Sequence, residues 1–331
     1  MNRISNKVVV VTGGAGFIGS NLCNDLVKDN EVVCLDNFMT GKRENINHLL
    51  EHSNFKLVEG DIRNEEDCKT AIAGADIVLH QAALGSVPRS IENPILTNSV
   101  NIDGFLMELN TCFKQGVKRF VYAASSSTYG DHPGLPKVEE KIGNPLSPYA
   151  VTKYVNELYA RVYYQLHGLE VMGLRYFNVF GRNQDPDGAY AAAIPKFLKA
   201  FLAHESPIVH GDGEQSRDFT YIENVIQANH LAGIVKNEKA IGEVYNVAFG
   251  DRTTVNQLIK AIKSSLSTFD SGVNSVEVNH GEERVGDVKH SLASIDKAKE
   301  LLGYNPEYSL EKGLEEAISW YYGYLKNKAH V

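Results

Sequence analysis

Tyr149 and Lys153 are the two residues whose types and spacing most directly indicate chemistry in this sequence. They stand four residues apart, so on a helix their side chains share one face. A phenol has an ordinary pKa of about 10 and is a poor base at neutral pH, but a nearby ammonium and the positive end of a helix dipole favour the phenolate. The pair could therefore take a proton from an alcohol. Because ordinary amphipathic helices also carry such pairs, the interpretation depends on the rest of the chain.

A helix is expected to begin directly before the pair. Ser147 is a preferred N-cap residue, and Pro148 suits the first helical position. An apolar periodic pattern then continues from Tyr149 to about His167. This places Tyr149 in the first turn, where the helix dipole acts most strongly.

A glycine-rich segment near the start has the context of a dinucleotide-binding loop. The β-branched run Lys7–Thr12 predicts a strand buried on both faces, and a helical pattern follows the glycines. Glycine allows a tight turn and a close approach of the backbone to a pyrophosphate, which then lies at the helix N-terminus. The glycines of this segment are Gly13, Gly14, Gly16 and Gly19.

A carboxylate follows the second predicted strand. This strand, Glu31–Leu35, ends at Asp36, about twenty residues beyond the glycines. An acid at this place can accept both ribose hydroxyls and would repel a 2′-phosphate. The sequence therefore predicts NAD rather than NADP.

Strands and helices alternate through the first half of the chain. Further strands are expected at residues 55–59, 76–80, 119–124 and 170–175, with helical patterns near 65–72 and 94–115. This alternation predicts an α/β protein with a Rossmann-type, doubly wound parallel sheet whose ligand lies at the carboxyl ends of the strands. The polar residues that follow the strands are Asp36, Asp61, His80, Gln81, Ser125, Ser126 and Ser127.

The composition changes after Arg175, where a turn-rich loop covers residues 181–188. Helices are expected near 192–203, 223–235, 254–266 and 310–326, and strands near 208, 219, 244–247 and 275–279. We expect an NAD-binding domain over residues 1–176 and a smaller α/β substrate-binding domain over 177–331. The chain is expected to cross between them.

Composition narrows the possible partners and location. A net charge of -8 provides no basic surface for nucleic acid. The apolar run Val8–Val11 is too short for a membrane segment. The four cysteines, Cys23, Cys34, Cys68 and Cys112, have no paired spacing, which favours reduced thiols in a cytoplasmic protein.

One pattern resembles a zinc motif. His48, Glu51 and His52 fit H-x-x-E-H, but no third ligand is evident. A solvated helix face is the favoured interpretation, and no metal site is expected.

Together these segments resemble the extended short-chain dehydrogenase/reductase family over nearly the whole chain. The matching stretches are TGGAGFIGS (12–20), LDNFMTGK (35–42), GDIR (60–63), HQAA (80–83), SSSTYG (125–130), PYAVTK (148–153) and LRYFNVFG (174–181). Within the family the chain resembles UDP-sugar 4-epimerases, and especially the UDP-N-acetylglucosamine 4-epimerases of surface-polysaccharide synthesis. That likeness is carried by SSSTYGDHPGLPKVEE, GAYAAAIPKF and GEERVGDVKHS.

The resemblance implies a reaction through a 4-keto sugar. Tyr149, with its pKa lowered by Lys153 and the nicotinamide charge, would take the proton of the sugar 4-hydroxyl while NAD accepts the C4 hydride. The sugar would then turn over and receive the hydride on its other face, so NAD could remain bound. Ser125 is the expected hydrogen-bond partner of the 4-oxygen, although Ser126 and Ser127 compete for that role.

The resemblance also implies two sets of binding residues. The expected cofactor-binding residues are Gly13, Gly16, Phe17, Ile18, Gly19, Asp36, Asn37, Thr40, Gly41, Asp61, Ile62, Gln81, Ala82, Ala83, Tyr149, Lys153 and Tyr176. The expected substrate-binding residues are Ser86, Ser125, Ser126, Tyr149, Asn178, Arg217, Arg252, Arg284, Asp287 and Ser291. The arginines would hold the UDP diphosphate and ribose, and Ser291 would line the sugar pocket.

The loop after residue 124 separates reaction classes. Related 4,6-dehydratases carry Thr-Asp-Glu there, and decarboxylases have Glu where Ser127 stands, so epimerisation is favoured. The alternatives are a UDP-glucose 4-epimerase, another NAD-dependent nucleotide-sugar enzyme such as a dehydratase or decarboxylase, and a non-catalytic NAD-binding relative. Non-catalytic relatives usually lose the Tyr or the Lys. The resemblance further implies a homodimer that pairs the helices near 94–115 and 150–167. The preferred sugar among UDP-GlcNAc, UDP-GalNAc and their uronic acids stays open.

Overall fold

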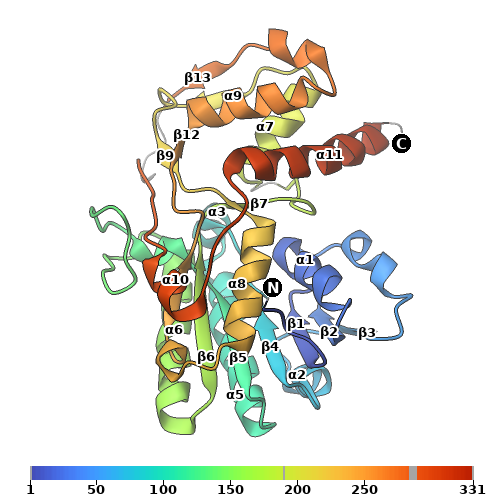
Figure 1. Ribbon diagram of the computed structural model, residues 1–331, viewed down its shortest axis with the longest axis vertical. Helices are drawn as coiled ribbons and strands as arrows, with labels where there is room; N and C mark the ends of the chain where they lie inside the picture. The colour runs from blue at the N-terminus through green and yellow to red at the C-terminus, as the bar shows by residue number, and fades with distance from the viewer. Residues whose placement is uncertain (1, 189–190, 283–288, 330–331) are drawn as a thin grey trace.

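The computed structural model describes residues 2–188, 191–282 and 289–329. A central sheet with helices on both faces forms its lower part in Figure 1, and a smaller part lies above the sheet. The strands of the sheet are β1 (Val8–Thr12), β2 (Glu31–Asp36), β3 (Phe55–Glu59), β4 (Ile77–His80), β5 (Arg119–Ser125), β6 (Glu170–Tyr176) and β11 (Val244–Val247). The helices around it are α1 (Phe17–Leu26), α2 (Glu65–Ile72), α3 (Val87–Glu92), α4 (Pro94–Asn98), α5 (Phe105–Lys114), α6 (Pro148–His167), α8 (Ile222–Ile234) and α10 (Asp296–Leu302).

The seven strands are all parallel, in the order β11-β6-β5-β4-β1-β2-β3. The predicted Rossmann-type, doubly wound sheet is therefore confirmed. Successive valines of β1 are buried on both faces of the sheet. Val9 and Val11 belong to one core cluster and Val10 to a second, because helices cover both faces of the sheet.

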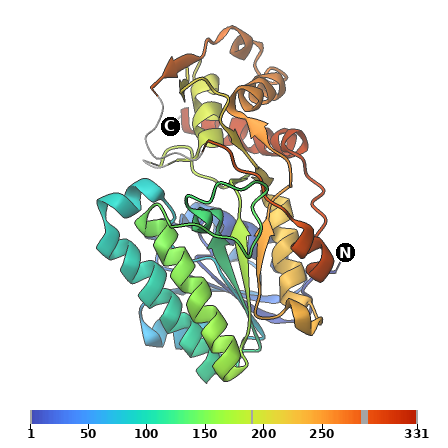
Figure 2. The same ribbon diagram turned by 90° about the vertical axis from the view of Figure 1, so that its left-hand side faces the viewer.

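The two faces are covered by different helices. Helices α2, α5 and α6 pack on one face, with α5 and α6 side by side in Figure 2. Helices α1 and α8 pack on the other and lie next to each other in Figure 1. A hydrogen bond links these two helices, with His230 Nε2 2.6 Å from Asp25 Oδ2.

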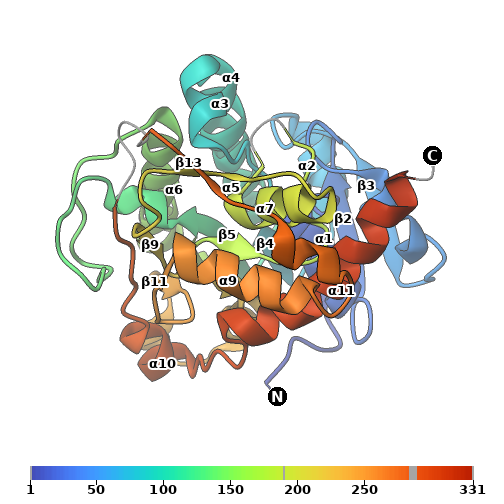
Figure 3. The same cartoon turned by 90° about the horizontal axis from the view of Figure 1, so that it is seen from above.

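The chain crosses back to the sheet after residue 176, because both α8 and the seventh strand, β11, come from the second half. The smaller part contains the helices α7 (Ala193–Leu202), α9 (Val255–Leu266) and α11 (Leu310–Ala329), which pack against one another and are seen from above in Figure 3. Its short strands pair as β7 (Val179–Phe180) with β10 (Thr220–Tyr221), β9 (Ser216–Arg217) with β12 (Thr253–Thr254), and β8 (Ile208–His210) with β13 (Asn279–Gly281).

Two expected elements differ from the structure. The helix predicted over 94–115 is divided by a π-helical turn, Ser99–Gly104, in which the Asn101 side chain accepts from the Leu84 N–H at 2.8 Å. The strand predicted at 275–279 begins only at Asn279, because residues 271–275 form a 3₁₀ turn capped by Asp270. The short helices α3 and α10 were not expected, since few apolar residues mark them.

Other features bear on the sequence-based expectations. All four cysteines are buried, and none is in a disulfide. No helix in the described ranges is long and apolar enough to cross a membrane.

Candidate active site

The helix that carries Tyr149 and Lys153 begins as predicted. The Ser147 hydroxyl oxygen accepts a hydrogen bond from the Ala150 N–H at 3.1 Å, and Pro148 occupies the first helical position. This capping aligns α6 so that Tyr149 lies in its first turn. The helix ends at His167, where Gly168 adopts a left-handed conformation.

Tyr149 meets Ser125, which ends strand β5. The phenol is half-buried, and burial raises its pKa, while a hydrogen bond with the Ser125 side chain lowers it. Among the three consecutive serines, all within the described residues, Ser125 is the one that hydrogen-bonds the phenol. Its oxygen also accepts from the Ser127 N–H at 3.2 Å and from the Ser127 hydroxyl at 2.9 Å.

Lys153 is buried, and its ammonium donates to the Ala123 carbonyl oxygen at 2.8 Å. Burial lowers its pKa to about 8, and the nearby Glu157 carboxylate partly opposes that shift. Burial raises the pKa of Tyr149 in this structure, and its lowering by Lys153 together with the nicotinamide charge stays a prediction for the NAD-bound protein. The ammonium is directed to a backbone carbonyl of β5, which the sequence pattern did not reveal.

An ion pair lies beneath this site. Glu157, one turn beyond Lys153 on α6, binds Arg175 of β6 through two hydrogen bonds of 2.8 and 2.7 Å. Both side chains are buried, and the Arg175 guanidinium also lies over the Tyr129 ring. This contact joins α6 to the sheet directly below the candidate catalytic residues.

The glycine loop packs closely against the end of β4 and the start of α1. Gly13 has φ of +64°, and a Cβ there would lie 2.7 Å from the Ala82 Cα. A Cβ on Gly19 would lie 2.1 Å from the Gly13 carbonyl oxygen, so only glycine lets α1 pack so near the loop. Helix α1 begins after Gly16 without a side-chain cap, which leaves its first N–H groups available to a phosphate. Phe17 and Ile18 form its first turn.

Asp36 lies next to this loop at the end of β2. Its carboxylate accepts from the Ala15 N–H at 2.9 Å and the Phe38 N–H at 2.8 Å, and burial raises its pKa. Gly41 approaches the same carboxylate, since a Cβ on Gly41 would lie 2.8 Å from Asp36 Oδ1. The neighbouring Thr40 is exposed.

Asp61 forms a second polar group near the same edge. Its carboxylate accepts from Arg63 at 2.9 and 2.6 Å and from Asn37 at 2.8 Å, and the Arg63 hydrogen bonds lower its pKa to about 2. Ile62 is buried and packs against Gly104.

A polar contact links the sheet to the second half of the chain. The Tyr176 hydroxyl donates to Gln81 at 3.2 Å, and Asn229 of α8 donates to that hydroxyl at 2.9 Å. Ala82 and Ala83 follow Gln81 at the end of β4 and are partly exposed. Asn229 was missed from the sequence because its helix carries no motif.

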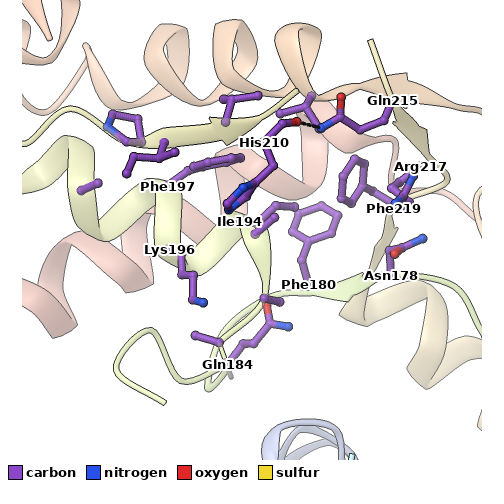
Figure 4. Close-up of a pocket in the computed structure, with 18 of the residues that line it drawn as sticks. Asn178, Phe180, Gln184, Ile194, Lys196, Phe197, His210, Gln215, Arg217 and Phe219 are labelled. Carbon is purple, nitrogen blue, oxygen red and sulfur yellow. Dashed lines mark hydrogen bonds between the residues drawn. The ribbon is translucent and has the colours of Figure 1, made fainter. Parts of the chain in front are cut away.

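A pocket of about 560 Å³ lies in the smaller part of the molecule (Figure 4). Two predicted substrate residues, Asn178 and Arg217, lie on the same side of it. Aromatic and polar side chains that the sequence did not single out complete its lining, among them Phe180, Phe197, His210 and Phe219. Such a mixture of apolar walls and a few polar groups is typical of small-molecule sites.

The remaining predicted substrate residues are more dispersed. Ser86 caps α3, accepting from the Arg89 N–H at 3.2 Å. Arg252 is exposed beside β12, whereas the Ser291 N–H donates to Ser216 of β9 at 3.0 Å. Arg284 and Asp287 lie outside the described residues.

The zinc-like segment is solvent-exposed and lies away from the sheet edge. His48 is in a 3₁₀ turn and lies 3.0 Å from Asn24 Oδ1, and His52 is exposed. In the described ranges, no group of three potential metal ligands occurs.

Comparison with known proteins identifies the family of this chain. The model of the NAD dependent epimerase/dehydratase family matches residues 9–248. The chain belongs to that family. It is an extended short-chain dehydrogenase/reductase that uses NAD, as the sequence predicted.

Several proteins that are similar to this chain are named as 4-epimerases of UDP-sugars. A putative UDP-glucose 4-epimerase of Methanocaldococcus jannaschii is 38% identical over 95% of this chain and 98% of its own. A structure of a UDP-N-acetylglucosamine 4-epimerase from Methanobrevibacter ruminantium, in complex with UDP-N-acetylmuramic acid, is 39% identical, with a TM-score of 0.90 over 97% of this chain and 100% of that chain. A UDP-glucuronic acid 4-epimerase from Bacillus cereus, solved with UDP-glucuronic acid and NAD, is 33% identical, with a TM-score of 0.86 over 96% and 99% of the two chains.

These relatives agree on the general chemistry and differ in the sugar. The family member described here is therefore related to UDP-sugar 4-epimerases over essentially its whole length. The differing sugars mean that the substrate must be argued from the residues of this chain.

Proposed function

We propose that this protein is an NAD-dependent 4-epimerase of UDP-N-acetylhexosamines. The observation that carries the proposal is the contact of Tyr149 with Ser125 at the end of β5, beside the buried ammonium of Lys153. Ser126 and Ser127 provide hydroxyls where elimination or decarboxylation would need carboxylates. The likeness to a UDP-N-acetylglucosamine 4-epimerase supports the same choice.

NAD would be held by the glycine loop and by Asp36. Gly13 and Gly19 allow the loop to pack closely against Ala82 and the start of α1, and the uncapped N-terminus of α1 has backbone N–H groups that suit a pyrophosphate. The Asp36 carboxylate would accept the ribose hydroxyls. When bound, NAD supplies a reversible hydride acceptor with a positively charged ring. We propose that the unit that binds it comprises residues 1–176 with α8 and β11 of the second half.

Tyr149 would act as the base toward the sugar 4-hydroxyl. The Ser125 hydroxyl would hydrogen-bond the same sugar oxygen and hold it near the phenol. The Lys153 ammonium would favour the phenolate by its positive charge and bind the nicotinamide ribose. Because the pKa of Tyr149 is raised by burial, proton transfer needs this added positive charge.

The UDP moiety would occupy the pocket of Figure 4. Arg217 and Asn178 lie at its edge, and a guanidinium suits the diphosphate because it can donate two parallel hydrogen bonds. Ser291 directly follows His290, which bridges to Ser216 of β9. Its side chain is small and would leave room for a 2-acetamido group. The uronic acids of these sugars are part of the same substrate class.

A homodimer is also proposed. Apolar side chains of α6 are exposed along one face, namely Val151, Leu158, Val162 and Leu166. Ile95 of α4, which is 80% exposed, lines a surface hollow with Val151. An apolar surface of this kind is typical of a protein interface, and a second copy would cover it by pairing equivalent helices.

Incubation of the purified protein with each UDP-sugar, followed by NMR of the products, tests the proposed function. We expect interconversion of UDP-GlcNAc and UDP-GalNAc without added cofactor. A new 4-keto-6-deoxy sugar or a pentose would show a dehydratase or a decarboxylase instead. No conversion of any UDP-sugar by the NAD-loaded protein would contradict the proposal.

A further inference from the structure

Asp218 lies between β9 and β10 and is completely buried. Its Oδ1 accepts hydrogen bonds from the backbone N–H groups of Phe249, at 3.2 Å, and Gly250, at 3.3 Å. Its Oδ2 accepts from the Ala293 N–H at 3.2 Å. Within the described part of the chain, backbone N–H groups supply all the hydrogen bonds that this carboxylate accepts. One side chain thus joins three segments that are far apart in the sequence.

Each of these segments carries a candidate substrate residue. Arg217 directly precedes Asp218, Arg252 follows the Gly250 turn by two residues, and Ser291 precedes Ala293 by two residues. A fourth candidate, Asn178, donates from its side chain to the Asp218 carbonyl oxygen at 3.0 Å. Asp218 is therefore placed at the centre of the proposed substrate-binding residues.

Backbone pairing arranges the same segments side by side. β9 pairs with β12, so Arg217 stands opposite Thr253, and Ser216 bridges to His290 on its other side. The paired stretches are short, with two residues in each of β9 and β12. Ladders this short cannot fix the position of a segment alone, whereas the buried carboxylate adds three hydrogen bonds behind them.

We propose that Asp218 is a positioning residue for the diphosphate of the nucleotide sugar. It holds the segments of Arg217, Arg252 and Ser291 in their binding arrangement without touching the substrate. This role rests on the proposed function for the identity of the ligand, but UDP binding tests it without turnover.

The charge of Asp218 adds a signature that a merely structural residue would not have. Burial raises its pKa to about 7, the three N–H donors lower it, and the neighbouring Asp251 carboxylate raises it further. Tyr304 also interacts electrostatically with Asp218, and its hydroxyl donates to the Ala248 carbonyl oxygen. The ionised carboxylate can accept all three hydrogen bonds, whereas a protonated oxygen is a poor acceptor. UDP binding should therefore weaken as the pH falls through about 7.

The test compares D218N with the wild-type holoenzyme. The amide has nearly the same size, but its NH₂ group cannot accept the Ala293 N–H. We expect the Kd for UDP, measured by calorimetry at pH 8, and the KM for the UDP-sugar to rise about tenfold. The kcat and the NAD content should stay close to wild type, because Tyr149, Lys153 and the glycine loop belong to other elements. D270N is the matched control, since Asp270 also accepts a backbone N–H, that of Gly272, but holds no candidate substrate residue.

The pH dependence of the Kd provides a second test. The terminal phosphate of UDP itself titrates with a pKa of about 6, so the Kd of both proteins depends on pH. The Kd of the wild-type protein should rise more steeply between pH 8 and pH 6 than that of D218N, which is already high at pH 8. An equal Kd for both proteins at pH 8, or a parallel loss of kcat and NAD in D218N, would overturn the proposal. An equally steep pH dependence of the Kd in both proteins would also overturn it. If UDP binds as predicted but no UDP-sugar is converted, the positioning role stands and the proposed function fails.

Discussion

The ammonium of Lys153 donates a hydrogen bond to the carbonyl oxygen of Ala123, at 2.8 Å. Ala123 lies two residues before Ser125 on the same strand, β5. One strand therefore holds both the candidate partner of the sugar oxygen and the anchor of the buried lysine. This relationship ties α6 to the sheet at the point where chemistry is proposed, and it leads to a pH-dependent prediction.

Turnover should decrease as the pH rises through about 8. The protonated form of Lys153 supplies the charge that favours the phenolate, and burial lowers the pKa of this lysine to about 8. The charge is present below that pH and lost above it. A kcat profile from pH 6 to 10 tests this, and the residual activity of Lys153→Met should lack the alkaline decrease. Lys114→Met, at an exposed lysine of α5, should keep the wild-type profile; a wild-type kcat that rises steadily to pH 10 would contradict the assignment.

Tyr149→Phe should reduce turnover by at least about 100-fold, the low end for loss of a general base. The ring keeps its packing, and only the hydroxyl that meets Ser125 is removed. NAD should remain bound, as measured by absorbance after denaturation. A Phe variant that keeps near-normal activity would exclude Tyr149 as the base.

The purified protein should carry NAD and need none added. Each catalytic cycle returns the hydride to the sugar, so the cofactor is not consumed. Asp36→Ala should lose NAD on dialysis at least about ten times faster, since two hydrogen bonds between a carboxylate and the ribose would be missing. Accumulation of NADH in proportion to product would instead indicate a dehydrogenase.

The exposed face of α6 predicts a dimer at micromolar concentration. Leu158→Glu places a charge in that face and should convert the protein to a monomer by light scattering. Leu50→Glu is the matched control, because Leu50 is 50% exposed and Leu158 is 49% exposed, yet Leu50 lies away from α6. A wild-type monomer, or equal behaviour of the two variants, would contradict this interface.

Ser291→Tyr should separate acetylated from plain sugars. An aromatic ring at this position would fill the space required by a 2-acetamido group in a close-packed wall. Activity toward UDP-GlcNAc should fall at least about tenfold relative to UDP-glucose, because a clash of this size costs about 2 kcal/mol in packed surroundings. The two substrates are assayed side by side. Equal losses would mean general disruption, and no loss would mean that Ser291 does not line the sugar site.

Local patterns in the sequence determined much of the fold and part of the site. The strand, glycines and helix over residues 8–26, and the start of α6 at Pro148, were predicted because caps and periodicity act between residues within four positions. The carboxylate at Asp36 was placed by the same local order. The family, the parallel sheet and NAD followed from these segments.

Tertiary structure decided which distant groups meet. It brought Ser125 to the Tyr149 phenol, directed the Lys153 ammonium to the Ala123 carbonyl oxygen and added β11 to the sheet from the second half. It also gathered the backbone donors of three separate segments around Asp218. Contacts of this kind depend on how elements far apart in the chain pack together, and no pattern within one segment encodes a side-chain direction that is set by a neighbour from another.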